Sequence, residues 1–359
     1  MDDFVAPGAE LLGAEPDVSR ADAIFAPVLD RRPVARGYAG ELTDLLRPEY
    51  CMFPLIGRSQ ELQALLAWLE EEAPFVRAVV GSGGSGKTRL AIEFCVRAEA
   101  LGWEAGFIGT PVTRALSGDQ RRRLVVVDGM SEDIAASAIR AAGPASRVLL
   151  LMQDADACAR LGVTGPVLLG GVRSVEDRAA LLNRVVRAAC SRSRSPARNV
   201  PACLLLDSAE PLHLVMAGLL APVIGIEASL ALPVSALAAD IAQIEAERLD
   251  KGAMRAGLDP TLVRHLAACI TVQGGCDVEA AEEIGAEEAQ AFGFHMPQEP
   301  AYVADVLADL LSGPDGDRLE PIGPVVIGDA FVRNEFSRHD IETRAAIADR
   351  ARNRFALSR

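Results

Sequence analysis

The segment that most constrains this chain spans residues 81–88 and reads GSGGSGKT. It matches the pattern G-x-x-x-x-G-K-[ST] at every position. A short β-rich run, 75–80, precedes it, and a helical pattern, 87–101, follows it. Glycines let a backbone curl so that successive N–H groups point at an anion, and a helix turns its positive N-terminal end toward the same anion. These features predict a phosphate-binding loop formed by Gly81, Ser82, Gly83, Gly84, Ser85 and Gly86.

Lys87 and Thr88 complete the predicted loop. The Lys87 ammonium is expected to reach the β- and γ-phosphates of a nucleotide, and the Thr88 hydroxyl is expected to be a ligand of Mg²⁺. Composition supports this interpretation, because only two of the 36 basic residues, Lys87 and Lys251, are lysines. An ammonium is a compact point charge, whereas a guanidinium is a wide fork that fits poorly inside a curled loop. A glycine-rich turn without a ligand would not explain the Lys-Thr pair at this offset.

Asp128 is the second residue that points to nucleotide chemistry. It follows four aliphatic residues, 124–127, in a predicted buried strand, and open α/β sheets bind ligands at the carboxyl ends of their strands. We therefore expect Asp128 to hold Mg²⁺ together with Thr88. Gly129 follows it instead of a second carboxylate, so rapid hydrolysis is not expected. Gln153, after the next predicted strand, is a candidate sensor of the γ-phosphate.

Predicted strands alternate with helical patterns over the first half of the chain. Most of the strands are continuous apolar runs, which indicates a parallel sheet covered on both faces. One of them separates the phosphate loop from the strand of Asp128, as in the branch of P-loop folds with an inserted strand. After residue 201 the pattern is mostly helical. The predicted strands span 75–80, 104–109, 124–128, 147–152 and 166–169.

The net charge of −14 argues against nucleic acid as a general partner, because phosphate is bound by a surplus of Lys and Arg. Seven cysteines without a C-x-x-C pair are typical of buried thiols in a reducing compartment. The apolar stretch 211–239 is interrupted by Pro222, Glu227 and Pro233, which leaves pieces shorter than the roughly 20 residues of a membrane span. We therefore expect a cytoplasmic protein with no membrane partner.

Two further segments resemble motifs of the STAND NTPases, which are signal-transduction relatives of the AAA+ ATPases. Residues 53–62, FPLIGRSQEL, are similar to the motif h-h-G-R-E-x-E-L, with Ser59 in place of the first glutamate. Residues 210–214, EPLHL, are similar to the G-x-P motif of the helical lid, with Ala209 in place of the glycine. The resemblance implies that Pro211 packs against the base. It also implies nucleotide contacts for Ile56, Gly57, Arg58 and Arg89.

The resemblance implies an α/β P-loop NTPase domain with a parallel, ASCE/AAA+-like sheet, followed by a helical lid and a winged-helix-like domain. ATP or ADP with Mg²⁺ would be the cofactors. The expected parts are an N-terminal arm, the nucleotide-binding domain, the lid, the winged-helix-like domain and a C-terminal tail, over residues 1–50, 51–190, 191–258, 259–340 and 341–359.

The leading hypothesis is a STAND-like switch with slow ATPase activity, in which nucleotide state controls domain docking and contact with a protein partner or a second copy. A DNA-handling AAA+ ATPase that uses its winged helix is one alternative. A scaffold that binds nucleotide and does not hydrolyse it is another, and Gly129 keeps it open.

Overall fold

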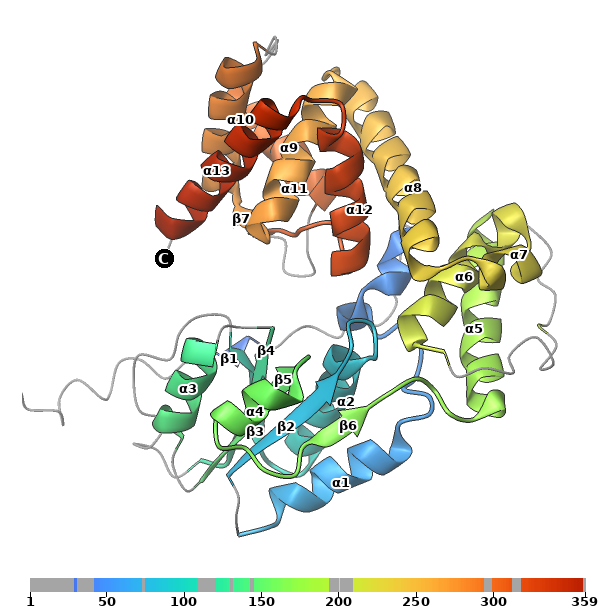
Figure 1. Ribbon diagram of the computed structural model, residues 1–359, viewed down its shortest axis with the longest axis vertical. Helices are drawn as coiled ribbons and strands as arrows, with labels where there is room; N and C mark the ends of the chain where they lie inside the picture. The colour runs from blue at the N-terminus through green and yellow to red at the C-terminus, as the bar shows by residue number, and fades with distance from the viewer. Residues whose placement is uncertain are drawn as a thin grey trace, which may run out of the picture.

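The computed structural model describes residues 29–30, 42–72, 75–108, 121–129, 132–142, 145–193, 200, 209–293, 299–311 and 318–357. An α/β layer contains the sheet, helices α5–α7 extend from one side of it, and α8–α13 form a separate helical layer (Figure 1). Within the described part of the chain, no helix combines the length and apolar character needed to cross a membrane.

The sheet has six strands in the order β1-β3-β4-β5-β2-β6. The short strand β1 runs antiparallel to β3, and the remaining pairs are parallel. The five strands expected from the sequence are all present, and each of their bounds differs by at most one residue. In chain order the strands are β1 (Leu29–Asp30), β2 (Val76–Gly81), β3 (Glu104–Ile108), β4 (Arg123–Asp128), β5 (Ser146–Met152) and β6 (Val167–Leu169).

Helices cover both faces of this sheet. Alternate strand residues, such as Val126 and Leu149, share a core with Trp68 and Phe94 of one helical layer. Their neighbours in sequence pack against the other layer, because successive side chains of a strand point to opposite faces. Continuous aliphatic strands are therefore buried on both sides. The first layer is α1 (Ser59–Leu69) and α2 (Lys87–Ala100), and the second is α3 (Glu132–Ala141) and α4 (Ala155–Arg160).

Three helices lie beside the sheet, and we call them the lid: α5 (Val175–Ser193), α6 (Pro211–Ile224) and α7 (Ile226–Ala231). The lid expected from the sequence, 191–258, begins near the end of α5 and also includes residues 234–255. The helix α5 packs closely against α6, and a Cβ at Gly218 of α6 would lie 2.7 Å from Val185 of α5. Only glycine permits that approach. The segment 42–50 forms short 3-10 turns, Leu42–Leu46 and Pro48–Tyr50, and its residues Leu45 and Leu46 are buried against the lid. This part of the N-terminal arm is therefore packed rather than extended.

The C-terminal layer follows the order helix, strand, two helices, strand, which is typical of a winged helix. The strands β7 (Cys276–Asp277) and β8 (Arg318–Leu319) pair antiparallel. One continuous core of buried residues runs from Leu45 through the lid to Ile347. The helices are α8 (Val234–Arg255), α9 (Pro260–Gln273), α10 (Val278–Phe292), α11 (Pro300–Leu311), α12 (Val325–Phe336) and α13 (Ile341–Leu357).

Candidate functional site

The glycine-rich segment forms a loop between the end of β2 at Gly81 and the start of α2 at Lys87. Gly84 and Gly86 have φ values of 84° and 91°, a region that side chains with a Cβ rarely adopt. The first turn of a helix leaves its backbone N–H groups without intrahelical partners. Those of α2 are therefore available at the loop for an anion.

The Lys87 side chain folds back over the loop. Its ammonium donates hydrogen bonds to the carbonyl oxygens of Gly81 at 2.7 Å and Ser82 at 2.9 Å. Burial lowers the pKa of Lys87 below its ordinary value, and the nearby carboxylates of Asp128 and Glu210 oppose that shift. A partly desolvated cation beside oriented N–H groups is well placed to bind phosphate.

Thr88 and Asp128 lie side by side, as the sequence predicts. The Thr88 hydroxyl donates to Asp128 Oδ2 at 2.8 Å, although the two residues lie on different elements. The carboxylate comes from the end of β4, and the hydroxyl comes from the first turn of α2. Both donors are oxygens, which Mg²⁺ prefers as ligands. The residues present therefore fit a hydrated Mg²⁺ ion next to the loop.

The order of the strands that carry the loop and Asp128 identifies the fold. β5 lies between β2 and β4 in the sheet, and β3 intervenes between them along the chain. The chain has a P-loop NTPase fold. The inserted strand β3 places it in the AAA+-like branch, and the lid and winged-helix-like layers follow the sheet as expected.

A cavity of about 250 Å³ adjoins the loop. Its lining is mainly apolar, which suits the flat face of a base, and one end opens onto the loop. Ile56 and Pro211 both line it, as the STAND resemblance implies. The other lining residues come from the segment 45–58, the residues 84–89, helices α5 and α6, and Pro324.

Arg58 lies at the edge of this cavity but contacts the protein backbone. Its buried guanidinium donates to Ser85 O at 3.0 Å and also to Gly170 O, and it pairs with Glu61 at 3.3 Å. Arg58 therefore ties the phosphate loop to the end of β6. Gly57, with a φ of 70°, turns the chain just before it.

Arg89 joins α2 to the segment that precedes α1. It donates to Phe53 O at 3.2 Å and pairs with Glu93 at 3.3 Å. Gln153 is exposed and follows Met152, which pairs with Val80 in the neighbouring strand. Gln153 therefore lies at the same edge of the sheet as the loop, where the sequence analysis expects it.

The lid contacts the loop at the first turn of α6. Ser82 Oγ donates to Glu210 Oε1 at 2.7 Å, and the Leu212 N–H donates to Gly84 O at 3.2 Å. A Cβ at Gly84 would lie 2.7 Å from Leu212 Cβ, so this glycine permits the close approach of the lid. Glu210 was not among the residues predicted for the site. The available signal was its charge at the variable position of G-x-P, which reads Ala209-Glu210-Pro211 in this chain.

No family model matches the chain, and no curated protein matches it. Solved structures resemble it at low identity. The Orc1 protein of Aeropyrum pernix in complex with DNA is 14% identical with a TM-score of 0.35, over 83% of this chain and 98% of that one. A Walker-type ATPase of Pyrococcus abyssi is 13% identical with a TM-score of 0.36, over 80% and 99%.

The replication initiator DnaA bound to AMPPCP and single-stranded DNA is 12% identical with a TM-score of 0.32, over 69% of this chain and 95% of that one. At these TM-scores the similarities are too distant to carry an argument about function. The expectation that nucleic acid is not a partner gains no support from them, since two of these proteins are bound to DNA.

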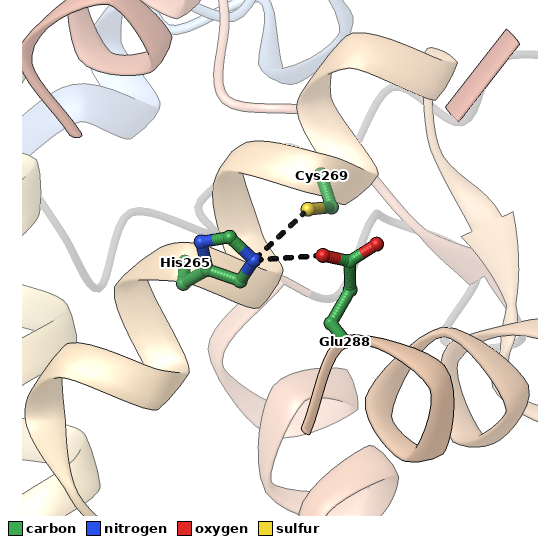
Figure 2. Close-up of side chains that lie close together, drawn as sticks. All are labelled: His265, Cys269 and Glu288. Atoms are coloured by element: carbon green, nitrogen blue, oxygen red, sulfur yellow. Dashed lines mark hydrogen bonds and ion pairs between the residues drawn. The ribbon is translucent and has the colours of Figure 1, made fainter. Parts of the chain in front are cut away.

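A second polar cluster lies away from the loop, between α9, α10 and α13. Figure 2 shows His265 and Cys269 on one face of α9, with Glu288 of α10 opposite them. His265 Nε2 lies 3.0 Å from Glu288 Oε2 and 3.7 Å from Cys269 Sγ, and all three residues are buried. These are donor types that zinc prefers, so the cluster is a candidate metal site.

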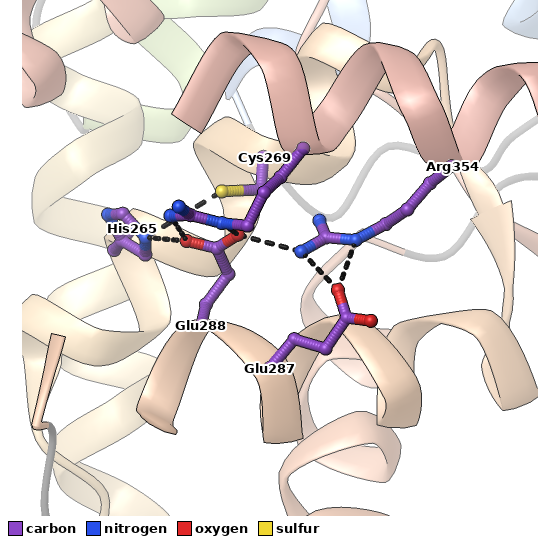
Figure 3. Close-up of polar contacts among 6 residues, drawn as sticks. His265, Cys269, Glu287, Glu288 and Arg354 are labelled. Atoms are coloured by element: carbon purple, nitrogen blue, oxygen red, sulfur yellow. Dashed lines mark hydrogen bonds and ion pairs between the residues drawn. The ribbon is translucent and has the colours of Figure 1, made fainter. Parts of the chain in front are cut away.

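The arginines of α13 argue against a metal there. Arg350 donates to both Glu288 oxygens at 2.9 and 2.8 Å, and Arg354 donates to Oε1 at 2.7 Å. Figure 3 shows Arg354 bridging Glu288 and Glu287. Two guanidinium groups already compensate the carboxylate and would repel a cation. Burial also raises the pKa of Cys269, which opposes the thiolate that a metal needs. The cluster is a buried ion network that holds α13 onto α9 and α10.

This network predicts acid sensitivity. Burial raises the pKa of Glu288, but the hydrogen bonds from Arg350, His265 and Arg354, together with the charge of Arg350, outweigh burial and hold this pKa well below its usual range. The folded-state pKa lies below the unfolded value of about 4.3, so the stabilisation is complete above that pH and is lost as pH falls through the folded pKa. Urea unfolding at pH 7 and at about pH 3.5, which lies just below the unfolded pKa, checks this. Wild type should lose more stability on acidification than Glu288→Gln, and equal losses would contradict the prediction.

Proposed function

We propose that this chain is a nucleotide-dependent switch that binds ATP or ADP with Mg²⁺ and hydrolyses ATP slowly. One observation carries the proposal: the phosphate loop, the Thr88–Asp128 pair and an apolar cavity meet at a point where the lid also contacts the loop. A base in the cavity and phosphates on the loop would place the terminal phosphate at the lid contact. Nucleotide state would then alter how the lid packs.

Each residue has a separate task in this proposal. Lys87 and the loop N–H groups bind the β- and γ-phosphates, and Thr88 and Asp128 hold Mg²⁺, which neutralises charge on the phosphates. Ile56 and Pro211 enclose the base. Arg58 positions the loop through Ser85 O. The output would be contact with a protein partner or a second copy, as in the STAND NTPases, and the cytoplasm would be the compartment.

Slow hydrolysis follows from the residues after β4. Gly129 offers no carboxylate to polarise water, and Glu132 pairs instead with Arg160 at 2.5 Å. We expect purified protein to turn over ATP below about 0.1 s⁻¹, against a median near 10 s⁻¹ for enzymes in general. A phosphate-release assay checks this, and turnover near the median would contradict it.

Asp128→Asn should remove most of the gain in nucleotide affinity that Mg²⁺ provides. The variant keeps the shape of the side chain and the acceptor for Thr88 but lacks the charge that attracts the ion. Titration of ADP with Mg²⁺ and with EDTA measures this gain, and we expect it to fall about tenfold, the equivalent of one charge-assisted contact. Asp133→Asn, an exposed change on α3, is the matched control. An unchanged Mg²⁺ effect in Asp128→Asn would remove Asp128 from the metal site.

The alternative of a DNA-handling ATPase finds little support in the helices themselves. The helix α11 is the third helix of the winged-helix order, and it contains no basic residue. Its exposed face carries Asp305 and Asp309, which would repel phosphate. A shift assay with duplex DNA at low and at high salt discriminates the two proposals, because salt-sensitive binding would favour DNA as a partner.

A further inference from the structure

Glu210 directly precedes α6, in surroundings that are unfavourable for a carboxylate. Its Oε1 accepts the hydrogen bond from Ser82 Oγ, whereas its Oε2 is buried and has no hydrogen-bond partner in the described part of the chain. An unsatisfied buried oxygen of a carboxylate costs stability. A neutral glutamine would lower that cost, because an unpartnered charged group costs more than an unpartnered neutral one, and it would still accept the hydrogen bond from Ser82. We therefore looked for a function that requires a negative charge at this position.

The charges around the phosphate loop indicate such a function. The Lys87 ammonium interacts with two carboxylates, Asp128 and Glu210, and it bonds to the carbonyl of the same Ser82 that Glu210 contacts. Asp128 would also be balanced by Mg²⁺, whereas Glu210 has Lys87 as its counter-charge. Lys87 marks the end of the loop that receives the β- and γ-phosphates. A carboxylate beside it opposes each further negative charge that a nucleotide brings there.

We propose that Glu210 is the residue by which this site distinguishes nucleoside diphosphates from nucleoside triphosphates. With a diphosphate, the carboxylate stays on Ser82 and the lid stays on the loop. A γ-phosphate repels the carboxylate, breaks the Ser82–Glu210 hydrogen bond and weakens the adjacent bond between Leu212 N–H and Gly84 O. This inference rests on the proposed function and names the contact through which the phosphate reaches the lid.

The change Glu210→Gln isolates the charge. Glutamine keeps the length of the side chain and an oxygen that accepts from Ser82, so the lid contact survives while the repulsion disappears. We expect wild type to bind ADP about tenfold more tightly than the non-hydrolysable triphosphate AMPPNP, in line with one charge pair at a partly exposed site. In Glu210→Gln the two dissociation constants should come within about twofold of each other, through tighter AMPPNP binding. Calorimetric titration of both nucleotides with Mg²⁺ measures the ratio.

Glu227→Gln is the matched control, because it removes an exposed acid from the first turn of α7, in the same lid. It should leave the ratio unchanged. Hydrogen exchange of the backbone amides in residues 210–215 gives a second measurement. In wild type these amides should exchange faster with AMPPNP than with ADP, and in Glu210→Gln the difference should vanish.

The outcomes separate the inference from the function on which it rests. If wild type binds neither nucleotide, the proposed function fails, and this inference fails with it. If wild type binds both but Glu210→Gln leaves the ratio and the exchange difference unchanged, the inference alone is overturned. A variant that loses hydrolysis at an unchanged affinity ratio would also overturn it, because the carboxylate would then act on water and not on nucleotide choice.

Discussion

Replacement of Lys87 by alanine should weaken the binding of both ADP and ATP about a hundredfold, which corresponds to roughly 2.7 kcal/mol. The substitution removes a cation that is partly desolvated and held at the loop by the carbonyl oxygens of Gly81 and Ser82. Charge-assisted hydrogen bonds to phosphate are about twice as strong as neutral ones. Loss of the ammonium also leaves Asp128 and Glu210 without the opposing charge between them. Titration with each nucleotide measures the effect.

The chain provides its own control, because Lys251 is the only other lysine. It lies exposed on α8, away from the loop, and Lys251→Ala should bind nucleotide like wild type. The same pair permits a test without mutation. An amine-reactive reagent followed by mass spectrometry should show that ADP protects Lys87 and leaves Lys251 reactive. Wild-type affinity in Lys87→Ala, or equal labelling of both lysines with ADP, would refute the assignment of the loop.

Glu288→Gln should lower the free energy of unfolding by about 3 kcal/mol at neutral pH. The carboxylate is completely buried and accepts hydrogen bonds from His265, Arg350 and Arg354. Removing its charge leaves two guanidinium groups of α13 without their main anionic partner, and breaking a buried pair costs more than the pair contributes. Urea unfolding followed by circular dichroism measures the loss.

The neighbouring residue supplies a matched control. Glu287 pairs with Arg354 at 2.7 Å, but its side chain is 58% exposed. Ion pairs of this kind contribute less than about 1 kcal/mol, so Glu287→Gln should change stability little. Equal effects of the two adjacent substitutions would contradict the interpretation of the cluster as a buried network.

The sequence predicted the sheet well because its strands are continuous aliphatic runs that end in recognisable chemistry. β4 and β5 are buried on both faces, which is why their sequences are continuous aliphatic runs and do not alternate with polar residues. β1 was missed because two residues carry no periodicity. The burial of the short helical segment near residue 45 could not be predicted for a different reason: Leu45 and Leu46 are buried by helices far along the chain, which local patterns cannot indicate.

The residues of the candidate site also fall into two groups, those that local motifs predict and those that only the fold brings together. The loop and Asp128 were predicted because each motif contains its own chemistry. The nucleotide contact of Arg58 stays a prediction. The structure adds its hydrogen bonds to Ser85 O and Gly170 O, which depend on the return of the chain at β6 and which no local motif indicates. Glu210 meets Ser82 across 128 positions of sequence. Only the folded arrangement of α6 against the loop reveals that contact.

The helix α8 connects the lid to the other helices of the C-terminal layer. It contains 22 residues and is therefore about 33 Å long, and the core that begins at the lid continues past it to Ile347. A rod fixed at one end magnifies a small rotation, so a tilt of about 10° at the α6 end displaces the far end by about 6 Å. Helices α9–α13 follow that end in the chain and would move with it. A change at one phosphate oxygen would thus appear as a displacement of a whole surface, large enough for another molecule to recognise.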